Sequence, residues 1–192
     1  MERTLIDKLV EWKDKDLRKP LILKGVRQCG KTYLLKQFGK RYYEDTAYFN
    51  FEETEALKAV FEKDYDTKRI VFELGLHCGK TIQPGTTLLF FDEIQECGRA
   101  ITAMKYFCEN APEYHIVCAG SLLGIALQKQ ISFPVGKVDF LTLYPMNFLE
   151  FLRAGDEEVL ADYIEQFKKG EDLPAVVTEK LDANSGFTPE GN

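Results

Sequence analysis

The chain has 192 residues, which is enough for one domain of ordinary size with a small appendage. Apolar residues make up 45% of it and charged residues 29%, a globular composition that excludes a wholly disordered chain. The 25 lysines and arginines against 31 aspartates and glutamates give a net charge of −6, which excludes a generally basic nucleic-acid binder. The longest apolar runs, such as Leu88–Phe91, are much shorter than the roughly 18 residues that a membrane span needs.

The cysteine pattern favours reduced thiols. The five cysteines form no C-x-x-C pair, and an odd number is not typical of a disulfide framework. His77 and His115, the two histidines, lack a second ligand pair at the spacing of a zinc site. The first twelve residues have acidic side chains within their apolar part and no small-residue cleavage site, unlike a signal peptide. We therefore expect a cytoplasmic protein with no membrane contact.

The predicted elements alternate between helices and short apolar strands. Over the first dozen residues Leu5, Ile6, Leu9 and Val10 recur at helical spacing, and a charged loop ending at Pro20 follows. The pattern then predicts strands over 21–23, 47–51, 87–91, 115–119 and 138–143, and helices over 31–38, 55–62, 67–78 and 99–109. Continuously apolar strands are typical of a parallel sheet that is covered on both faces. We therefore expect a doubly wound α/β domain over about residues 15–145.

The clearest motif is G-V-R-Q-C-G-K-T over residues 25–32, a full match to the phosphate-binding loop G-x-x-x-x-G-K-[ST]. In such a loop the backbone N–H groups point at nucleotide phosphates, and the positive end of the following helix strengthens that field. Lys31 would place its charge on the β- and γ-phosphates, and Thr32 would offer its hydroxyl to Mg²⁺. The residues predicted to bind the nucleotide are Gly25, Val26, Arg27, Gln28, Cys29, Gly30, Lys31, Thr32 and Tyr33.

Two carboxylates follow the apolar run over 87–91. Asp92 comes 61 residues after Lys31, which fits the second nucleotide motif of ATPases. Asp92 would hold Mg²⁺ through its water shell, and Glu93 would orient and deprotonate the attacking water. A glutamate directly after the metal aspartate favours ATP hydrolysis, and the N-K-x-D signature of guanine-reading GTPases is absent. The alternative is an acidic strand end that only reaches solvent.

Ser121 follows the apolar strand over 115–119. We expect this strand to lie between the strand over 21–23, which precedes the loop, and the strand over 87–91, which precedes Asp92. There its side chain would face the γ-phosphate, as a third catalytic group beside Lys31 and Glu93. A helix cap is the other role that serine fills readily. Arg69 and Arg99 are candidates for stabilising charge on the transferred phosphoryl group, but the sequence assigns neither.

Five segments together resemble the prokaryotic AAA-type ATPases that carry a C-terminal domain of unknown function. They are LILKGVRQCGKTYLLKQFG, AYFNFEE, LLFFDEIQEC, YFCENAPEYHIVCAGSLLG and SFPVGKVDFLTLYPMNFLEFL. The resemblance covers about residues 1–155 and implies a P-loop NTPase fold of AAA+ type, with a parallel sheet in the order 5-1-4-3-2 and helices on both faces. It also implies ATP and Mg²⁺ as cofactors, with the family's functional positions at Lys31, Thr32, Asp92, Glu93 and Ser121.

The chain also departs from that family. Members often have arginine where Lys137 follows Gly136, and they continue for about as many residues again with a helical lid and the C-terminal domain. This chain ends in DANSGFTPEGN, so we expect a truncated or divergent member, or an excised ATPase core. We expect an ATP-binding core over 1–155, a helical extension over 156–181 that could begin a lid, and a disordered tail over 182–192.

The sequence therefore predicts an ATPase that depends on Mg²⁺ and converts ATP to ADP and phosphate. Two alternatives stay open. One is a non-hydrolysing module whose nucleotide-bound form a partner recognises. The other is a small-molecule phosphotransferase, which is disfavoured because Arg153 is the sole arginine of the C-terminal portion. ATP is the predicted partner, self-association or a protein partner stays open, and nucleic acid is not indicated.

Overall fold

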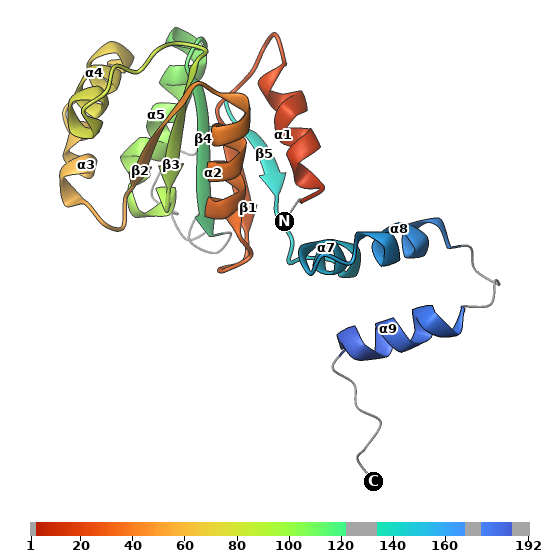
Figure 1. Cartoon of the computed structure of the whole chain (residues 1–192). Coiled ribbons are helices and arrows are strands. Elements are labelled where there is room, and N and C mark those ends of the chain that lie inside the picture. The colour runs from red at the N-terminus through yellow and green to blue at the C-terminus, as the bar shows by residue number, and fades with distance from the viewer. Residues whose placement is uncertain (1–2, 122–133, 168–173, 186–192) are drawn as a thin grey trace. The chain divides into compact units, whose positions relative to one another are not determined.

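The computed structural model describes residues 3–121, 134–167 and 174–185 (Figure 1). They divide into two compact units, one from Leu5 to Pro145 and a smaller one that joins Met1–Thr4 to Met146–Asn192. The segment that follows Ser121, for which a capped helix was the alternative prediction, lies outside the described residues, as does 186–192 of the predicted tail.

The larger unit is built on a parallel sheet. Within the described part of the chain the strand order is β2-β3-β4-β1-β5, which is the predicted order 5-1-4-3-2 counted from the other edge. The strands are β1 (Leu21–Gly25), β2 (Asp45–Asn50), β3 (Thr87–Asp92), β4 (His115–Ser121) and β5 (Asp139–Thr142). β4 pairs with both β1 and β3, so the strand that ends at Ser121 does lie between the strand before the loop and the strand that ends at Asp92.

The helices begin and end close to the predicted positions. In the larger unit they are α1 (Leu5–Lys13), α2 (Lys31–Tyr42), α3 (Glu55–Val60), α4 (Thr67–Cys78), the 3₁₀ turn η1 (Ile94–Glu96) and α5 (Gly98–Asn110). Asp66 sets the start of α4, because its carboxylate accepts hydrogen bonds from the Lys68 and Arg69 N–H groups. Gly79 ends the same helix in the left-handed conformation that favours glycine.

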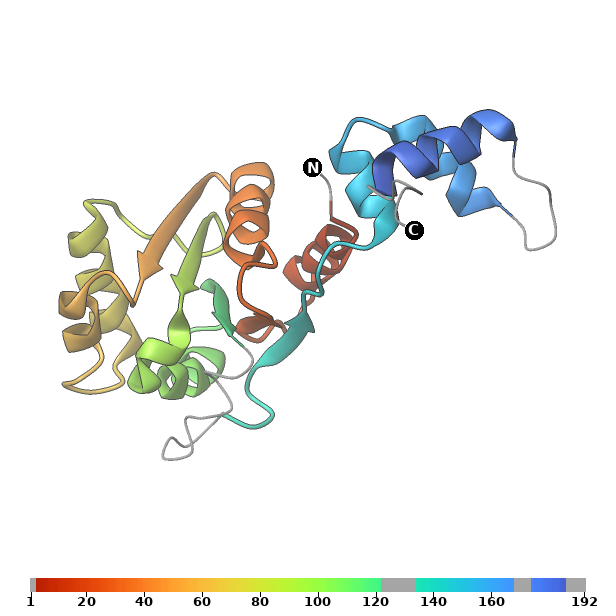
Figure 2. The same cartoon turned by 90° about the horizontal axis from the view of Figure 1, so that it is seen from below.

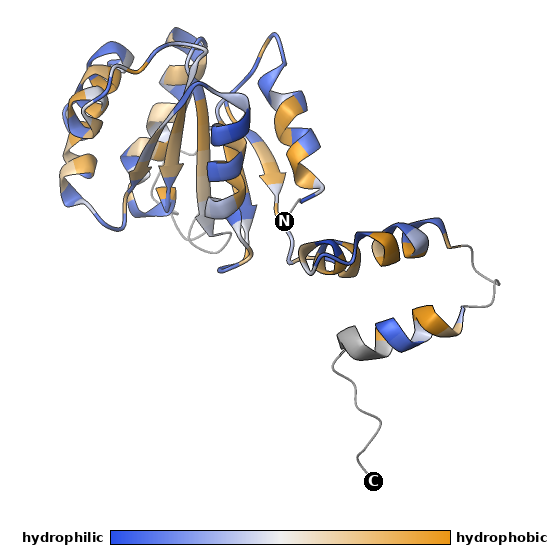
Figure 3. Cartoon of the chain, viewed as in Figure 1, coloured by the Kyte–Doolittle hydropathy of each residue, from blue (hydrophilic) through white to orange (hydrophobic). Residues whose placement is uncertain are grey.

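Helices cover both faces of the sheet, as predicted. In both views α2 lies on one side of the strands and α5 on the other (Figure 1 and Figure 2). Alternate side chains of each strand point to opposite faces, so each face has its own core. The core shared with α1 and α2 takes Leu21, Leu23, Leu88, Phe90, Val117 and Ala119 from the strands. The core shared with α3, α4 and α5 takes Ile22, Leu89, Phe91, Ile116 and Cys118. The strands are accordingly hydrophobic over much of their length, with hydrophilic residues at several of their ends (Figure 3).

His115 lies at the amino end of β4, at the opposite end of that strand from Ser121. Its Nδ1 is 2.7 Å from the Tyr43 hydroxyl, and the Trp12 ring meets it edge-on. Burial, reinforced by the positive charges of Arg18 and Lys13, lowers the pKa of His115 to about 4. The imidazole is therefore neutral at pH 7, and it anchors α1 and the end of α2 to the sheet.

The smaller unit is helical, with α7 (Phe148–Ala154), α8 (Glu158–Gln166) and α9 (Ala175–Ser185). Asn147 and Glu150 form a capping box at the start of α7, and Glu150 also accepts a 3.0 Å hydrogen bond from the Thr4 N–H. Its small core contains Leu152, Leu160, Ala161 and Val177. α9 continues past residue 182, where the tail was predicted to begin, and the predicted domain boundaries stay predictions.

No helix in the described ranges combines the length and the apolar composition that crossing a bilayer requires.

Candidate functional site

The predicted phosphate-binding loop joins β1 to α2. The backbone is left-handed at Gln28 (φ 62°) and at Gly30 (φ 92°), so the chain curls before the helix begins. Such a succession of turns directs backbone N–H groups into one concave surface that suits an anion. The Leu34 N–H then donates to the Gly30 carbonyl at 2.9 Å and opens α2. The loop therefore has the curled form that the motif predicts.

Lys31 occupies the inside of this curl. Its side chain is almost fully buried, and its Nζ donates to the Gly25 carbonyl at 3.1 Å and to the Val26 carbonyl at 2.8 Å. A buried ammonium needs such partners, because desolvation without them is costly. These carbonyls hold the Lys31 ammonium within the loop, where phosphate oxygens could replace them as hydrogen-bond acceptors.

Gly25 lies where no side chain fits. A Cβ added there would come within 3.0 Å of both the Leu143 carbonyl oxygen and the Cys29 Sγ. The Leu143 N–H donates to the Lys24 carbonyl at 2.7 Å, so this neighbour is fixed backbone next to β5. The first glycine of the motif is therefore required by packing.

Asp92 ends β3 with a carboxylate that is 3% exposed. One oxygen accepts from the Tyr48 hydroxyl at 2.9 Å, and the other accepts from the Glu93 N–H at 3.1 Å. Burial, with the Asp92 charge beside it, raises the pKa of Tyr48, so this hydroxyl keeps its proton and donates. A carboxylate has about four lone-pair positions, so Asp92 retains capacity to accept from further ligands.

Glu93 turns the chain directly after β3. Its backbone is left-handed (φ 49°, ψ 44°), which costs a residue with a side chain about 1–2 kcal/mol. Its carboxylate accepts a hydrogen bond from the Gln95 side-chain amide. The side-chain oxygen of Gln95, Oε1, in turn accepts a hydrogen bond from the Ser121 backbone N–H at 3.3 Å. Gln95 thus joins the predicted base to the end of β4.

The strand register brings these groups to one edge of the sheet. Gly25, the last residue of β1, is paired with Ser121, the last residue of β4. Asn50, the last residue of β2, is paired with Asp92 at the end of β3. Because the strands are parallel, their carboxyl ends meet at the same edge, where ligands of open α/β sheets bind.

The donor set suits magnesium. No group of three or more His, Cys, Asp or Glu side chains that could hold a metal exists among the described residues. Mg²⁺ does not need one, since it keeps several waters and binds one or two protein groups together with substrate phosphates. Asp92 at the end of β3 and Thr32, the second residue of α2, are the predicted oxygen donors for such a site.

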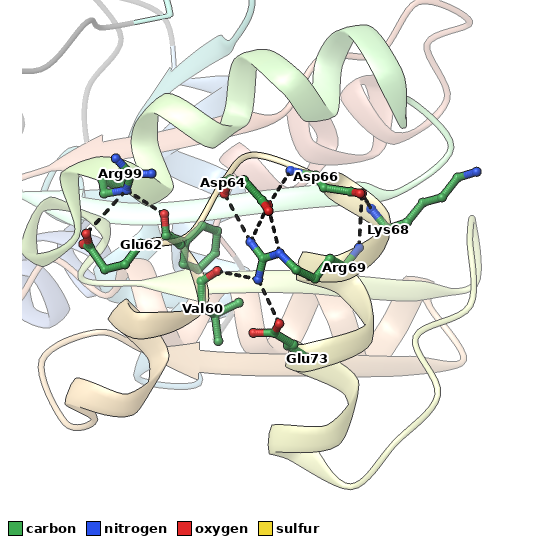
Figure 4. A network of polar contacts seen from close by, with 9 residues as sticks. Val60, Glu62, Asp64, Asp66, Lys68, Arg69, Glu73 and Arg99 are labelled. Carbon is green, nitrogen blue, oxygen red and sulfur yellow. Dashed lines mark hydrogen bonds and ion pairs between the residues drawn. The ribbon is translucent and has the colours of Figure 1, made fainter.

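The two arginines considered for the phosphoryl group bind the segment between α3 and α4 (Figure 4). Arg69 forms ion pairs with Asp64 at 2.7 Å and with Glu73 at 2.9 Å. Arg99 donates to the Phe61 carbonyl at 2.6 Å. Both arginines therefore stabilise this segment. Lys137, for which the family resemblance implied an arginine position, forms a 2.8 Å ion pair with a glutamate of α5, Glu109.

The other predicted nucleotide contacts lie on the outer part of the loop. Val26, Arg27, Gln28 and Tyr33 are exposed, whereas Cys29 is buried. Their contacts with nucleotide, like the roles of Thr32 and the Ser121 side chain, stay predictions.

Sequence reasoning missed Tyr48 and Gln95. Gln95 stands two residues after Glu93, which was the available signal for it. Tyr48 is recognisable only once β2 is paired with β3.

Comparisons with known proteins give one sequence relative and several structural likenesses. An uncharacterized protein of Methanocaldococcus jannaschii is 28% identical over 134 residues, which are 69% of this chain and 28% of that protein. The chain thus spans little more than a quarter of that relative.

Solved structures that resemble the chain include three from different organisms. DnaA from Aquifex aeolicus bound to AMPPCP has a TM-score of 0.47 and 15% identity, with 93% of this chain and 54% of that one covered. The ORC of Drosophila bound to DNA has a TM-score of 0.48 and 17% identity, with 83% and 48% covered. Pif1 helicase from Candida albicans has a TM-score of 0.45 and 12% identity, with 95% and 47% covered.

Residues 17–152 match the family model described as an AAA domain, and the chain therefore belongs to this family of ATPase-type nucleotide-binding domains.

Proposed function

We propose that this domain binds ATP together with Mg²⁺ and hydrolyses it to ADP and phosphate. The observation that supports this most is a continuous set of contacts at the carboxyl edge of the sheet. The Lys31 ammonium donates a hydrogen bond to the Gly25 carbonyl, and Gly25 is paired with Ser121 across β1 and β4. The Gln95 side chain connects Ser121 to Glu93 by hydrogen bonds. A phosphate-binding loop and a potential base are thereby held by one network.

Binding would begin in the loop. The curled backbone offers N–H groups to the phosphates, and Lys31 would exchange its two carbonyl acceptors for phosphate oxygens. Because the ammonium already has partners in the loop, the net gain is smaller than the gross strength of the new bonds. Thr32 and Asp92 would hold Mg²⁺, which neutralises charge on the phosphates when bound.

Hydrolysis requires a water to be deprotonated as it attacks. Glu93 would accept the proton while the water oxygen bonds to the γ-phosphorus and the bond to the β–γ bridging oxygen breaks. ADP leaves with that oxygen, and the proton passes from Glu93 to the released phosphate. The Ser121 hydroxyl would donate to an oxygen of the γ-phosphoryl group, where charge is spread in the transition state.

Phosphate release from Mg-ATP tests the proposal. We expect Lys31→Ala and Glu93→Gln each to lower turnover by at least about 100-fold, whereas only Lys31→Ala should remove most ATP binding. Glu96→Gln is the matched control, since Glu96 is an exposed carboxylate on the same turn. Turnover near the wild-type rate in Glu93→Gln would refute the assigned base.

The wild-type chain should also be assayed over a range of protein concentrations. Turnover that rises steeply with concentration would indicate catalysis within an assembly. ATP binding without phosphate release at any concentration would instead favour the non-hydrolysing nucleotide-gated module.

A further inference from the structure

We infer that Gln95 is a positioning residue, which holds the Glu93 carboxylate at a fixed position relative to the end of β4 during ATP hydrolysis. The inference deepens the proposed function and rests on it. The inference starts from the buried side chain of Gln95, which forms one hydrogen bond with the Glu93 carboxylate and another with the backbone N–H of Ser121 at the end of β4.

The position of Gln95 follows from the local fold. After the left-handed turn at Glu93, the chain forms a single 3₁₀ turn in which the Glu96 N–H donates to the Glu93 carbonyl at 2.9 Å. This turn brings the Gln95 side chain back across the end of β3 toward Ser121. Gln95 is 6% exposed, so its amide must find partners within the protein.

The chemistry of the two neighbours selects glutamine. The Ser121 N–H can only donate, and an ionised Glu93 carboxylate can only accept. A side chain between them must therefore present an acceptor to one and a donor to the other. The planar amide of Gln95 does both, and the same requirement fixes which end of the amide faces which neighbour.

The bond leaves Glu93 able to act. Gln95 binds one oxygen of the carboxylate, Oε2, so the other oxygen can take the proton of the attacking water. An amide bond to the carboxylate also restricts its rotation, which keeps the base at one distance from the phosphoryl group. Since Ser121 is paired with Gly25, the same amide ties the base to the strand that carries the loop.

Two substitutions at this position separate the contacts. Gln95→Met keeps an unbranched side chain of similar length and removes the hydrogen bonds to Glu93 and to the Ser121 N–H. Gln95→Glu keeps an acceptor for the Ser121 N–H but removes the donor to Glu93. We expect each to lower kcat by about 10- to 100-fold, with the KM for ATP and the affinity for a fluorescent ATP analogue changed less than about threefold. Gln37→Leu is the matched control, because Gln37 is an exposed glutamine on α2.

A double mutant tests whether Gln95 acts through Glu93. If it does, Gln95→Met should not lower the residual rate of Glu93→Gln any further, since the base that it positions is already absent. An equal loss of rate in both backgrounds, or a loss of ATP affinity that matches the loss of kcat, would indicate a merely structural role and would overturn the inference.

A nuclear magnetic resonance measurement reads the contact without turnover. In ¹⁵N-labelled protein the Gln95 side-chain amide is assigned by its absence from Gln95→Met, and Glu93→Ala should shift that resonance by removing the carboxylate acceptor. An unchanged resonance would overturn the inference even if the wild-type chain hydrolyses no ATP. Wild-type turnover in both Gln95 variants beside an inactive Glu93→Gln would overturn it while leaving the proposed function intact.

Discussion

Replacing Gly25 by alanine adds one methyl group at a crowded point of the loop over residues 25–32. The new Cβ would lie within 3.0 Å of the Leu143 carbonyl oxygen and 2.9 Å from the Cys29 Sγ. The sulfur can rotate away, but the carbonyl belongs to backbone that is bonded to Lys24 at 2.7 Å. Relief of the clash therefore requires a backbone shift at the β1–β5 edge.

The expected cost is that of an overpacked core site, about 1–3 kcal/mol. For a chain of this size, a loss of about 2 kcal/mol lowers the midpoint of thermal unfolding by about 4–8 °C. Because the shift begins at the first residue of the loop, we also expect ATP to bind at least about 10-fold more weakly. Thermal unfolding followed by circular dichroism measures the first effect, and calorimetric titration with ATP measures the second.

Gly155→Ala is the control for this substitution. Gly155 follows α7 with φ −94°, and an added Cβ would find its closest neighbour at 3.6 Å, an ordinary contact. We expect this variant to unfold and to bind ATP as the wild type does. A Gly25→Ala variant with wild-type unfolding and wild-type ATP affinity would refute the steric reasoning.

Three further predictions follow from contacts described above. The pKa of His115 is about 4 in the folded chain and near 6.5 in the unfolded chain. Below pH 6.5 the unfolded chain therefore binds a proton that the folded chain does not, and the free energy of unfolding decreases as the pH is lowered. Between pH 7 and pH 5 urea unfolding should therefore show a loss of about 2 kcal/mol that His115→Gln lacks; an equal loss in both proteins would contradict this. Arg69→Leu should lower stability by about 1 kcal/mol through its lost ion pairs and leave ATP turnover unchanged in the folded protein. Abolished phosphate release in folded Arg69→Leu would instead give this arginine a catalytic role. Tyr48→Phe removes the hydroxyl that binds Asp92 and should raise the Mg²⁺ concentration for half-maximal turnover by about 10-fold. A wild-type Mg²⁺ requirement in that variant would show that Tyr48 does not tune the metal site.

The strands and the loop were predictable because their signals are local, whereas the sheet order was implied by the family resemblance. Continuous apolar runs predicted the buried strands, and the motif over 25–32 predicted a strand, a tight loop and a helix in succession. Strand ends were less certain. β1 continues to Gly25 and β4 continues to Ser121, because these two end residues pair with each other across the sheet. Neither residue is part of an apolar run, so the sequence pattern did not include them in the strands.

The network around the carboxylates could not be predicted in the same way. Gln95 acquires its role from the left-handed turn at Glu93, and such a turn is unusual for a residue with a side chain. Tyr48 meets Asp92 only through the pairing of β2 with β3. The partners of Arg69 likewise depend on how the segment after α3 folds back, so charge alone left its role open.

Calorimetric titration of the full chain with ATP in the presence of Mg²⁺ is the most direct test of the central claim, which is that residues 25–32 form a working phosphate-binding loop. We expect one nucleotide to bind per chain, and Lys31→Ala to weaken binding by at least about 10-fold, as the loss of a charge-assisted contact requires. A wild-type chain that binds no ATP, or an affinity that Lys31→Ala leaves unchanged, would contradict the account.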